Sequence, residues 1–381
     1  MRVPINRDHK VLQMPTQSEP IRVLIVDDST YVRMVLARML GSARGISVVG
    51  QARDGVEAIA LAEELRPDVI TLDVEMPGLT GLEVLERLLP AHPIPVVMLS
   101  SLTHRGAEVT MRALQLGAVD FIGKPGSAGV PDLEAVRNQL LVKIRDAASA
   151  NVSVPAPGAA PTAPVASIRR GTVHRVPTVL IAASTGGPQT LHTLFASLPP
   201  GLPAAWAVTQ HMPPSFTTSL AARLASVSAI PFREASDGDV LSAGEGLLAR
   251  GDTHMIIGPQ GVVHTARSEP IWGCRPAADP MMASAAANLT GPLIGVVLTG
   301  MGSDGAEGLR RIKQAGGVAV AQDKHTSIIY GMPKAAAQTG VCDHILPLSD
   351  IPTHLVEIIN DLATRKSPEQ QRDEGAERRA V

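Results

Sequence analysis

The chain has 381 residues, of which 45% are hydrophobic, and its formal net charge at pH 7 is −2. This length predicts two domains of roughly 100–200 residues each, and the near-neutral charge argues against binding of nucleic acid or of anionic membranes. The two cysteines, Cys274 and Cys342, cannot form a disulfide framework. Because no apolar run reaches the roughly 18 residues of a membrane span, we expect a cytoplasmic monomer without membrane insertion.

The first unit, residues 20–149, alternates short apolar runs with amphipathic stretches. This alternation is typical of a parallel sheet whose strands are joined by crossover helices. We therefore predict an α/β unit with a five-stranded parallel sheet. The runs expected to form the strands are Val23–Val26, Ile46–Val49, Val69–Leu72, Val96–Leu99 and Ala118–Ile122.

Reactive side chains close most of these runs. Asp27 and Asp28 follow the first run, Asp73 follows the third, and Ser100 and Lys124 follow the last two. The carboxyl ends of parallel strands share one edge of the sheet, so three carboxylates should meet there. They would repel one another unless a hard cation such as Mg²⁺ neutralised them. The metal, the lysine and the hydroxyl could then receive a phosphoryl group, which makes Asp73 the predicted phosphoryl acceptor.

Three segments of this unit form a recognisable pattern: Val26-Asp27-Asp28, Leu72-Asp73-Val74-Glu75-Met76-Pro77-Gly78 and Gly123-Lys124-Pro125. With them the unit resembles a response-regulator receiver domain. The resemblance implies a flavodoxin-like fold, phosphorylated on Asp73 by a CheA-type histidine kinase with Mg²⁺ as cofactor. The residues that it implies are the metal ligands Asp27, Asp28, Asp73 and the backbone carbonyl of Glu75, and the switch residues Ser100, Phe121 and Lys124.

The composition changes at residues 150–176, where Ala, Pro, Val, Ser and Thr follow one another without a period. Such a segment cannot bury enough apolar surface to order itself, so we predict a flexible linker. A second α/β pattern occupies residues 177–365 and is expected to form a doubly wound domain. Residues 366–381 alternate charges of both signs and are expected to be a disordered tail.

In the second unit, three reactive side chains each follow an apolar run. The runs Thr178–Ala183, Ala204–Val208 and Leu293–Leu298 lead to Ser184, His211 and Asp304, respectively. A serine hydroxyl is a poor nucleophile unless an imidazole accepts its proton and a carboxylate orients that imidazole. The pattern therefore predicts a Ser-His-Asp triad that needs no cofactor. Its order along the chain differs from the Ser, Asp, His order of α/β-hydrolases.

Two alternatives concern the nucleophile. Ser184 could instead be the N-cap of a helix expected to begin near Gln189, although Gly186 and Gly187 favour a turn that exposes the hydroxyl. Cys274 is another possible nucleophile, but no histidine lies in a matching motif near it.

The other two members also have competitors. His254 is the chief alternative to His211, and a lone histidine is usually structural. Asp304 lies between Gly300-Met301-Gly302 and Gly305, in a loop suited to exposing the N–H groups that an oxyanion needs. Its competitors lie in polar segments typical of solvated turns, and they are Asp237, Asp239 and Asp252.

With these segments the second unit resembles the catalytic domain of the CheB protein-glutamate methylesterases, and the order receiver, linker, esterase extends the resemblance over nearly the whole chain. It implies Ser184 as nucleophile, His211 as general base, Asp304 as orienting carboxylate, the N–H of Met301 as oxyanion donor and Thr185 close by. The implied substrates are γ-glutamyl methyl esters on the cytoplasmic helices of methylated chemoreceptors, which yield glutamate and methanol. The resemblance also implies deamidation of certain receptor glutamines, and a role in adaptation.

Two positions depart from the family pattern. Ala182 stands where the family usually has glycine, two residues before the nucleophile. Ala277 and Ala278 follow Arg275-Pro276 where a serine and a larger apolar residue are usual. We expect the methyl group of Ala182 to crowd the nucleophile turn, and the two alanines after Arg275-Pro276 to affect substrate preference more than activity.

Two other functions remain open for a chain with a receiver. A transcription factor is disfavoured, because acidic residues outnumber basic ones in the second unit. A scaffold that binds receptors without esterase activity is the remaining alternative. For the esterase, we expect the unphosphorylated receiver to cover the site from its tether and phosphorylation to uncover it.

Overall fold

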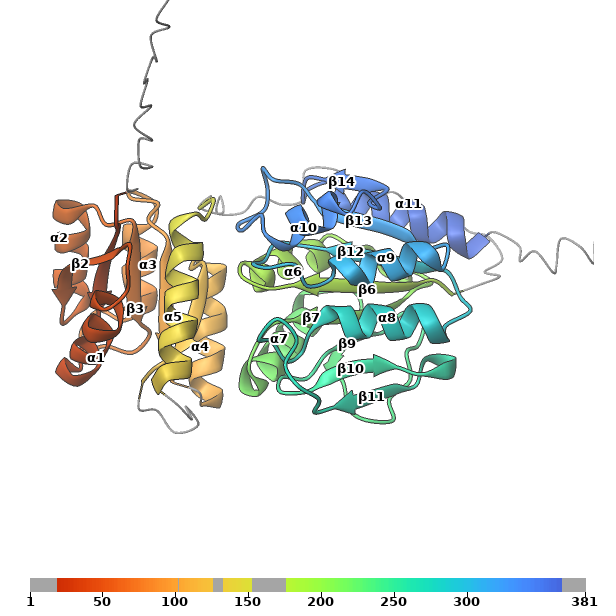
Figure 1. The fold of residues 1–381 in the computed structure, drawn as a ribbon, viewed down its shortest axis with the longest axis horizontal. Coiled ribbons are helices and arrows are strands. Elements are labelled where there is room, and N and C mark those ends of the chain that lie inside the picture. The colour runs from red at the N-terminus through yellow and green to blue at the C-terminus, as the bar shows by residue number, and fades with distance from the viewer. Residues whose placement is uncertain (1–18, 102, 126–132, 153–175, 365–381) are drawn as a thin grey trace, which may run out of the picture.

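The computed structural model describes residues 19–101, 103–125, 133–152 and 176–364. They form two α/β units, one from the N-terminal third of the chain and one from the C-terminal half (Figure 1). Most of the predicted linker and the whole predicted tail lie outside the described residues. None of the described helices is long and apolar enough to span a membrane.

The first unit is a parallel sheet in the order β2-β1-β3-β4-β5, as the α/β pattern predicts. Helices α1 and α5 pack on one face and α2, α3 and α4 on the other, so the central strands are buried on both faces. The strands are β1 (Ile21–Val26), β2 (Ile46–Ala52), β3 (Val69–Asp73), β4 (Val96–Ser100) and β5 (Asp120–Gly123). The helices are α1 (Thr30–Gly41), α2 (Gly55–Leu65), α3 (Gly81–Leu88), α4 (His104–Gln115) and α5 (Leu133–Ala148).

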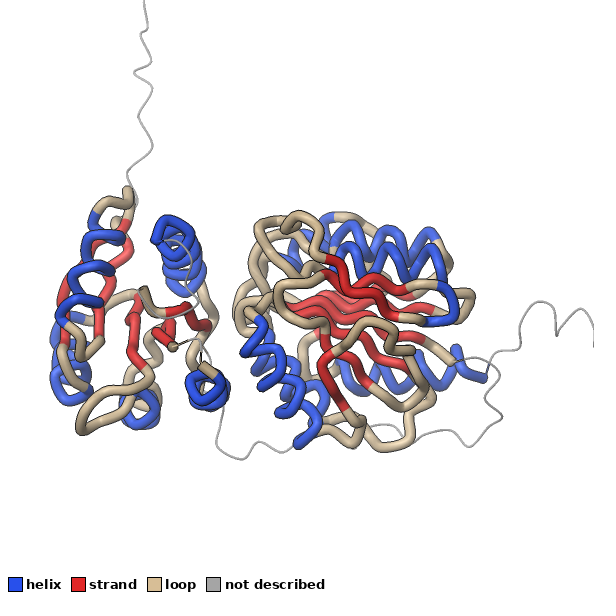
Figure 2. Tube along the Cα trace, turned by 90° about the horizontal axis from the view of Figure 1, so that it is seen from below, coloured by secondary structure: helices blue, strands red, loops and turns tan. Residues whose placement is uncertain are grey.

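The second unit is a seven-stranded sheet in the order β14-β13-β12-β6-β7-β9-β8, and its paired strands are parallel. Helices α6, α7 and α11 cover one face and α8, α9 and α10 the other, which confirms the doubly wound class (Figure 2). The strands are β6 (Thr178–Ala183), β7 (Ala205–Gln210), β8 (Phe232–Glu234), β9 (Gly246–Leu248), β12 (Leu293–Val297), β13 (Val318–Gln322) and β14 (His344–Leu346). The helices are α6 (Gly187–Ala196), α7 (Pro214–Val227), α8 (Ala278–Asn288), α9 (Ala306–Gln314), α10 (Met332–Gln338) and α11 (Ile351–Thr364).

An antiparallel hairpin, β10 (His254–Ile257) and β11 (Val263–Ala266), lies beside this sheet and was not expected from the sequence. Its strands are joined through the short 3₁₀ turn Pro259–Gly261. The chain returns from β11 to α8 through a loop that reaches the carboxyl edge of the main sheet, where the candidate site lies.

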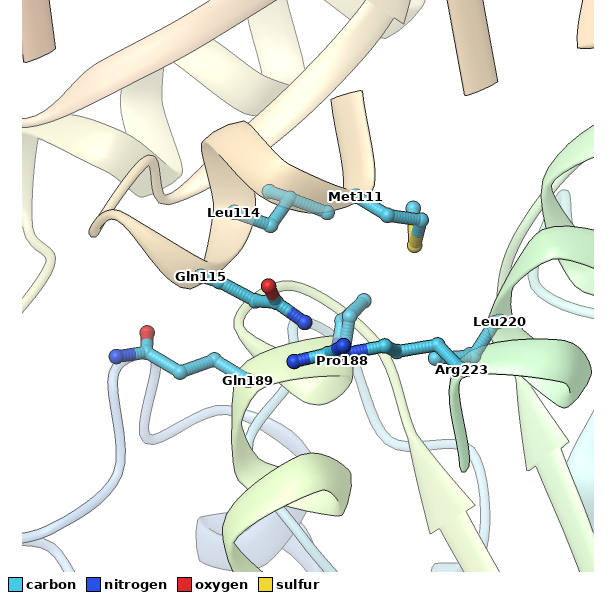
Figure 3. Close-up of a pocket in the computed structure, with 7 residues that line it drawn as sticks. All are labelled: Met111, Leu114, Gln115, Pro188, Gln189, Leu220 and Arg223. Atoms are coloured by element: carbon cyan, nitrogen blue, oxygen red, sulfur yellow. The ribbon is translucent and has the colours of Figure 1, made fainter. Parts of the chain in front are cut away.

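The two units contact each other along α4 of the first and α6 and α7 of the second. Figure 3 shows a small pocket in this contact, where Gln115 of α4 lies close to Arg223 of α7. Apolar side chains from both units surround these two polar groups, among them Met111, Leu114 and Leu220. The interface thus combines apolar packing with a few polar contacts.

Candidate functional site

Strand register brings the ends of β6, β7 and β12 together. Ala183 of β6 pairs with Gln210 of β7, and Val297 of β12 pairs with Ala182 of β6. The residues that follow these strands therefore lie at one edge of the sheet, where α/β proteins build their sites. Ser184 follows β6 at this edge, and its N–H donates to the carbonyl of Thr299 at 3.0 Å.

Ser184 is not a helix cap. Helix α6 begins at Gly187, two residues before the expected position, and its N-cap is Gly186 with φ of 76° and no side-chain cap bond. This left-handed conformation suits glycine, and a Cβ at Gly186 would lie 2.7 Å from Ile328. The turn closes tightly because the N–H of Gly187 donates to the carbonyl of Ser184 at 2.7 Å. The competing N-cap interpretation of Ser184 is therefore wrong.

The imidazole of His211 lies between the hydroxyl of Ser184 and the carboxylate of Asp304. Its Nδ1 is 3.1 Å from Ser184 Oγ, and its Nε2 is 2.7 Å from Asp304 Oδ2. Because a carboxylate only accepts, Nε2 carries the proton in this arrangement and Nδ1 presents its lone pair to the hydroxyl. The three side chains can therefore pass a proton from oxygen to nitrogen.

The carboxylate of Asp304 is held by backbone donors at the start of α8. Oδ2 accepts from the N–H of Ala278 at 2.6 Å, and Oδ1 accepts from the N–H of Asp279 at 2.9 Å. Burial alone would raise the pKa of Asp304, but the His211 bond and these N–H donors hold it below its usual value. Burial alone would lower the pKa of His211. The bond to Asp304 opposes this effect, and the pKa of His211 lies above its ordinary value. Asp304 is therefore favoured as a carboxylate, and it stabilises the imidazolium that forms when His211 accepts a proton.

The peptide between Gly300 and Met301 has a fixed orientation beside the nucleophile. The carbonyl of Gly300 accepts from the N–H groups of Met332 at 2.7 Å and Gly331 at 3.1 Å. In a trans peptide the next N–H points the opposite way, so the N–H of Met301 points away from the start of α10. A Cβ at Gly300 would lie 2.6 Å from Ser184 Cβ, so this backbone passes directly against the nucleophile.

The first unit has its own polar cluster at the carboxyl edge of its sheet. Carboxylate oxygens of Asp27, Asp28 and Asp73 lie within 4.8 Å of one another. Lys124 Nζ lies 3.1 Å from Asp27 Oδ2 and 2.5 Å from Asp73 Oδ2. Apart from this ammonium, these two buried oxygens have no hydrogen-bond donor among the described residues. Burial raises the pKa of Asp73 to about 6 despite the lysine. An oxygen cluster with unsatisfied anionic atoms fits a hard divalent cation.

The predicted switch residues lie nearby in different environments. Ser100 is buried, and its hydroxyl accepts from the hydroxyl of Thr110 at 2.7 Å. Phe121 faces the second unit, where its ring stacks on Phe216. The N–H of Glu75 donates to Asp73 Oδ1 at 3.1 Å, which places the Glu75 backbone beside the predicted phosphoryl acceptor.

A second contact between the units begins one residue after the nucleophile. Thr185 Oγ1 donates to Asp120 Oδ2 at 2.7 Å, and Asp120 Oδ1 lies 2.6 Å from Lys143 Nζ. The side chain of Thr185 is therefore bound to the first unit, which leaves only its backbone N–H to donate to an oxyanion. Asn151 adds a third contact, because its side-chain amide donates to the carbonyl of His325 at 2.7 Å.

Comparison with known proteins gives consistent matches along the chain. A family model described as CheB methylesterase matches residues 179–355, and one described as response regulator receiver domain matches residues 23–130. A protein-glutamate methylesterase/protein-glutamine glutaminase of Pyrococcus abyssi is 44% identical, over 91% of this chain and 95% of that protein. The chain belongs to the CheB family. A protein with the same name from Symbiobacterium thermophilum is 43% identical, over 90% of this chain and 98% of the relative.

Among solved structures, the CheB methylesterase catalytic domain of Thermotoga maritima is 42% identical and covers 47% of this chain and 97% of that domain, with a TM-score of 0.46. The family models and the relatives confirm the resemblance inferred from the motifs at the level of the family. The relatives are named as methylesterases, which are carboxylic ester hydrolases. Membership of their family confirms the prediction that this chain is an enzyme.

The competing histidine, His254, has a structural role in this chain. His254 is fully buried, and its Nδ1 accepts from the N–H of Ala277 at 3.1 Å. The competing aspartates are each engaged elsewhere. Asp252 pairs with Arg275 and Arg267, Asp239 with Arg233, and Asp237 accepts from the N–H of Thr265.

Sequence reasoning considered Cys274 only as an alternative nucleophile without a histidine partner, and it missed Asp279. Cys274 interacts with His211 and contributes to its raised pKa, after Asp304, although no motif pairs this cysteine with a histidine. Asp279 accepts from the N–H groups of Gly305 at 2.9 Å and Gly308 at 2.7 Å, so it ties the start of α9 to the start of α8. The sequence offered one indication of Asp279, which is an acidic residue in the first turn of α8 and follows Pro276 closely.

The alanine at position 182 is accommodated by its neighbour across the sheet edge. A Cβ at Gly305 would lie 3.0 Å from Ala182 Cβ, and Gly305 has φ of 85°. The methyl group of Ala182 therefore occupies space that glycine at position 305 leaves open. The crowding expected in the nucleophile turn is relieved in this way.

Proposed function

We propose that this chain is a protein-glutamate methylesterase that hydrolyses γ-glutamyl methyl esters on chemoreceptors through Ser184, His211 and Asp304. The observation that carries the proposal is the imidazole of His211 between the serine hydroxyl and a carboxylate held by N–H donors. Membership of the CheB family supports the substrate class. The same site would deamidate receptor glutamines, because an amide carbonyl accepts the same attack.

The chemistry follows from the positions of the atoms. Ser184 Oγ attacks the ester carbonyl while His211 Nδ1 takes its proton, and the resulting oxyanion accepts a hydrogen bond from the N–H of Met301. The imidazolium then protonates the departing methoxide, so methanol leaves and a glutamyl ester forms on Ser184. Water attacks this ester as His211 takes its proton, and the nitrogen returns the proton to Ser184 Oγ as glutamate is released.

Asp304 has two tasks in this sequence. Its bond to Nε2 selects the tautomer in which Nδ1 faces the hydroxyl, and its charge stabilises the imidazolium that forms in each half-reaction. The N–H groups of Ala278 and Asp279 keep the carboxylate ionised and oriented. Removing this carboxylate should therefore cost much of the rate.

The receiver is proposed to control this activity after phosphorylation of Asp73 by a CheA-type histidine kinase. Asp27, Asp28 and Asp73, with the carbonyl of Glu75, would hold Mg²⁺, which neutralises charge on a transferred phosphoryl group. Lys124 already contacts the carboxylate of Asp73 and would pair with the phosphoryl oxygens. These residues bind and orient, and Asp73 supplies the attacking oxygen.

We propose that the unphosphorylated receiver covers the esterase site and that phosphorylation uncovers it. In the unphosphorylated chain Asp120 holds Thr185, and Phe121 stacks on Phe216. The receiver would then stand in the way of a substrate helix, because Thr185, the residue next to Ser184, is bound to it. Phosphorylation would weaken these contacts and shift the population toward an uncovered site.

Release of methanol from methylated receptor membranes tests the proposed function directly. The full chain should release methanol in the presence of Mg²⁺ and a phosphoryl donor, and Ser184→Ala should not. A fluorophosphonate probe separates the enzyme from a receptor-binding scaffold, because a scaffold would leave Ser184 unlabelled. If the wild-type chain labels with the probe but releases no methanol, the substrate assignment is wrong while the hydrolase assignment stands.

A further inference from the structure

The loop between β11 and α8 contains a tight turn with an unusual residue. The N–H of Ile271 donates to the carbonyl of Cys274 at 3.1 Å and the reverse bond is 2.9 Å, so Trp272 and Gly273 form a two-residue turn. Both have positive φ, 55° for Trp272 and 74° for Gly273. Turns with this geometry favour asparagine, aspartate or glycine, and a bulky residue there is an outlier. The conformational preference of the turn does not explain the tryptophan.

Burial does not explain it either. Trp272 is 66% exposed, whereas the other tryptophan of the chain, Trp206, is fully buried in the core. The indole N–H of Trp272 lies 3.4 Å from Asp279 Oδ2, so one edge of the ring is held while most of the residue is exposed to solvent. A strained backbone at a residue that packs on no core is the kind of feature that function maintains.

The turn lies at the rim of the candidate active site. Cys274, two residues after Trp272, interacts with the imidazole of His211 and helps to raise its pKa. Asp279, which accepts from the indole, donates its own N–H to the carboxylate of Asp304 at 2.9 Å. The tryptophan is thus connected to two members of the triad through one residue each.

A second exposed apolar side chain belongs to the same site. Met301, which carries the proposed oxyanion N–H, is 42% exposed. Apolar side chains that are exposed singly are common and need no explanation. Here, however, both exposed residues belong to the candidate site. Met301 follows Gly300, whose backbone lies against Ser184. Trp272 is bonded to Asp279, whose N–H donates to Asp304.

We propose that Trp272 is the docking residue for the receptor helix that carries the scissile ester. The inference rests on the proposed function and adds the residue that determines specificity for a helical substrate. Tryptophan is among the residues that contribute most to binding, because its large rigid ring loses little entropy on contact. Amphipathic helices bind through apolar side chains one turn apart, and such side chains would rest on the ring while the methyl ester reaches Ser184.

The test compares receptor and small-ester hydrolysis by the phosphorylated full-length chain. Trp272→Asn removes the ring and keeps a residue that tolerates positive φ. We expect its KM for methylated receptor membranes to rise about tenfold, as for loss of a binding anchor, with kcat and the rate on an activated acetate ester changing less than about threefold. Trp272→Phe should recover most of the lost affinity. The control is Ile345→Ala on strand β14, which removes another exposed apolar side chain and should leave both rates as in the wild type.

Each outcome is decisive. An unchanged KM for Trp272→Asn overturns the docking role, provided the wild type releases methanol. An equal loss on receptor and on the small ester overturns it too, because that result means that the turn only supports the triad. If the wild type releases no methanol at all, the proposed function fails first. The thermal midpoint of Trp272→Asn should change little, since relief of backbone strain offsets the loss of the partly covered ring and of its bond to Asp279.

Discussion

Phe121 of the receiver unit and Phe216 of the catalytic unit stack nearly parallel, with ring centroids 4.1 Å apart and an angle of 20° between the planes. Phe121 is also a predicted switch residue, and its neighbour Asp120 binds the hydroxyl of Thr185. Two adjacent receiver residues therefore contact the catalytic unit, one at helix α7 and one beside the nucleophile. A change in β5 on phosphorylation would act on both contacts together.

This arrangement predicts that weakening the interface activates the enzyme. Asp120→Ala removes the bond to Thr185 and should raise the basal esterase rate severalfold without a phosphoryl donor. The fragment 151–381 should be at least as fast and should not respond to donors, because its cover is gone. Initial rates on methylated receptors measure both. If the folded fragment is no faster than the unphosphorylated full chain, relief of covering is excluded, and the phosphorylated receiver must contribute actively.

Substitution of the triad should abolish hydrolysis without disturbing the receiver. Ser184→Ala and His211→Ala should reduce kcat to a similar floor, and the double variant should be no worse, since triad members act as a unit. Asp304→Asn should cost on the order of 10⁴, as in serine proteases. A loss smaller than about tenfold would show that another group orients His211. Phosphorylation of Asp73 in each variant serves as the control for folding.

The raised pKa of His211 predicts the pH dependence of the esterase. A general base must be unprotonated, so activity is lost as pH falls through the pKa of the folded enzyme. Because the bond to Asp304 raises this pKa, the acidic limb of kcat/KM should lie above about 6.5, the ordinary imidazole value. Asp304→Asn should move the limb to lower pH and lower the plateau. A wild-type limb at or below 6.5 would contradict the assigned pairing.

Much of this site follows from the sequence because parallel strands end at one edge of a sheet. Ser184, His211 and Asp304 each follow a buried run of the second unit, and pairing of the strands brings the ends of these runs together without further information. The positions of Cys274 and Asp279 in the site were not predicted, for the opposite reason. They arrive from a loop, after a hairpin whose strands are too short to give a clear pattern, so only tertiary contacts place them. The Asp120 contact with Thr185 joins two separate units, and no local pattern encodes it.

Labelling should be confined to the predicted phosphoryl acceptor. Acetyl phosphate with Mg²⁺ should label Asp73, and Asp73→Asn should carry no label sensitive to acid and base. Asp28→Ala should also lose most of the label, because one metal ligand is removed. Label that persists in Asp73→Asn would refute the assignment. Ser184→Ala should label normally and serves as the matched control.

Asp146 on α5 predicts a pH-dependent stability. Burial and the neighbouring charge of Asp120 raise its pKa to about 7, although Lys143 opposes the shift. The folded chain therefore binds a proton that the unfolded chain releases near pH 3.8, and this group costs stability increasingly as pH rises from about 4 to 7. Asp146→Asn should stabilise the protein by about 1–3 kcal/mol at pH 8, and the gain should vanish near pH 4. Urea unfolding at both pH values measures this, and equal effects at the two would contradict the shift.

Asn151 affects how the receiver can move. Helix α5 ends at Ala148, and three residues later Asn151 is fixed to the catalytic unit by its bonds to the carbonyls of His325 and Ile328. If these bonds persist when the interface opens, the receiver rotates about a pivot of only two residues, Ser149 and Ala150, whatever the length of chain that follows. Its motion then has a fixed axis and a limited set of end positions, so the speed of reclosing is set by rotation rather than by diffusion on a long tether.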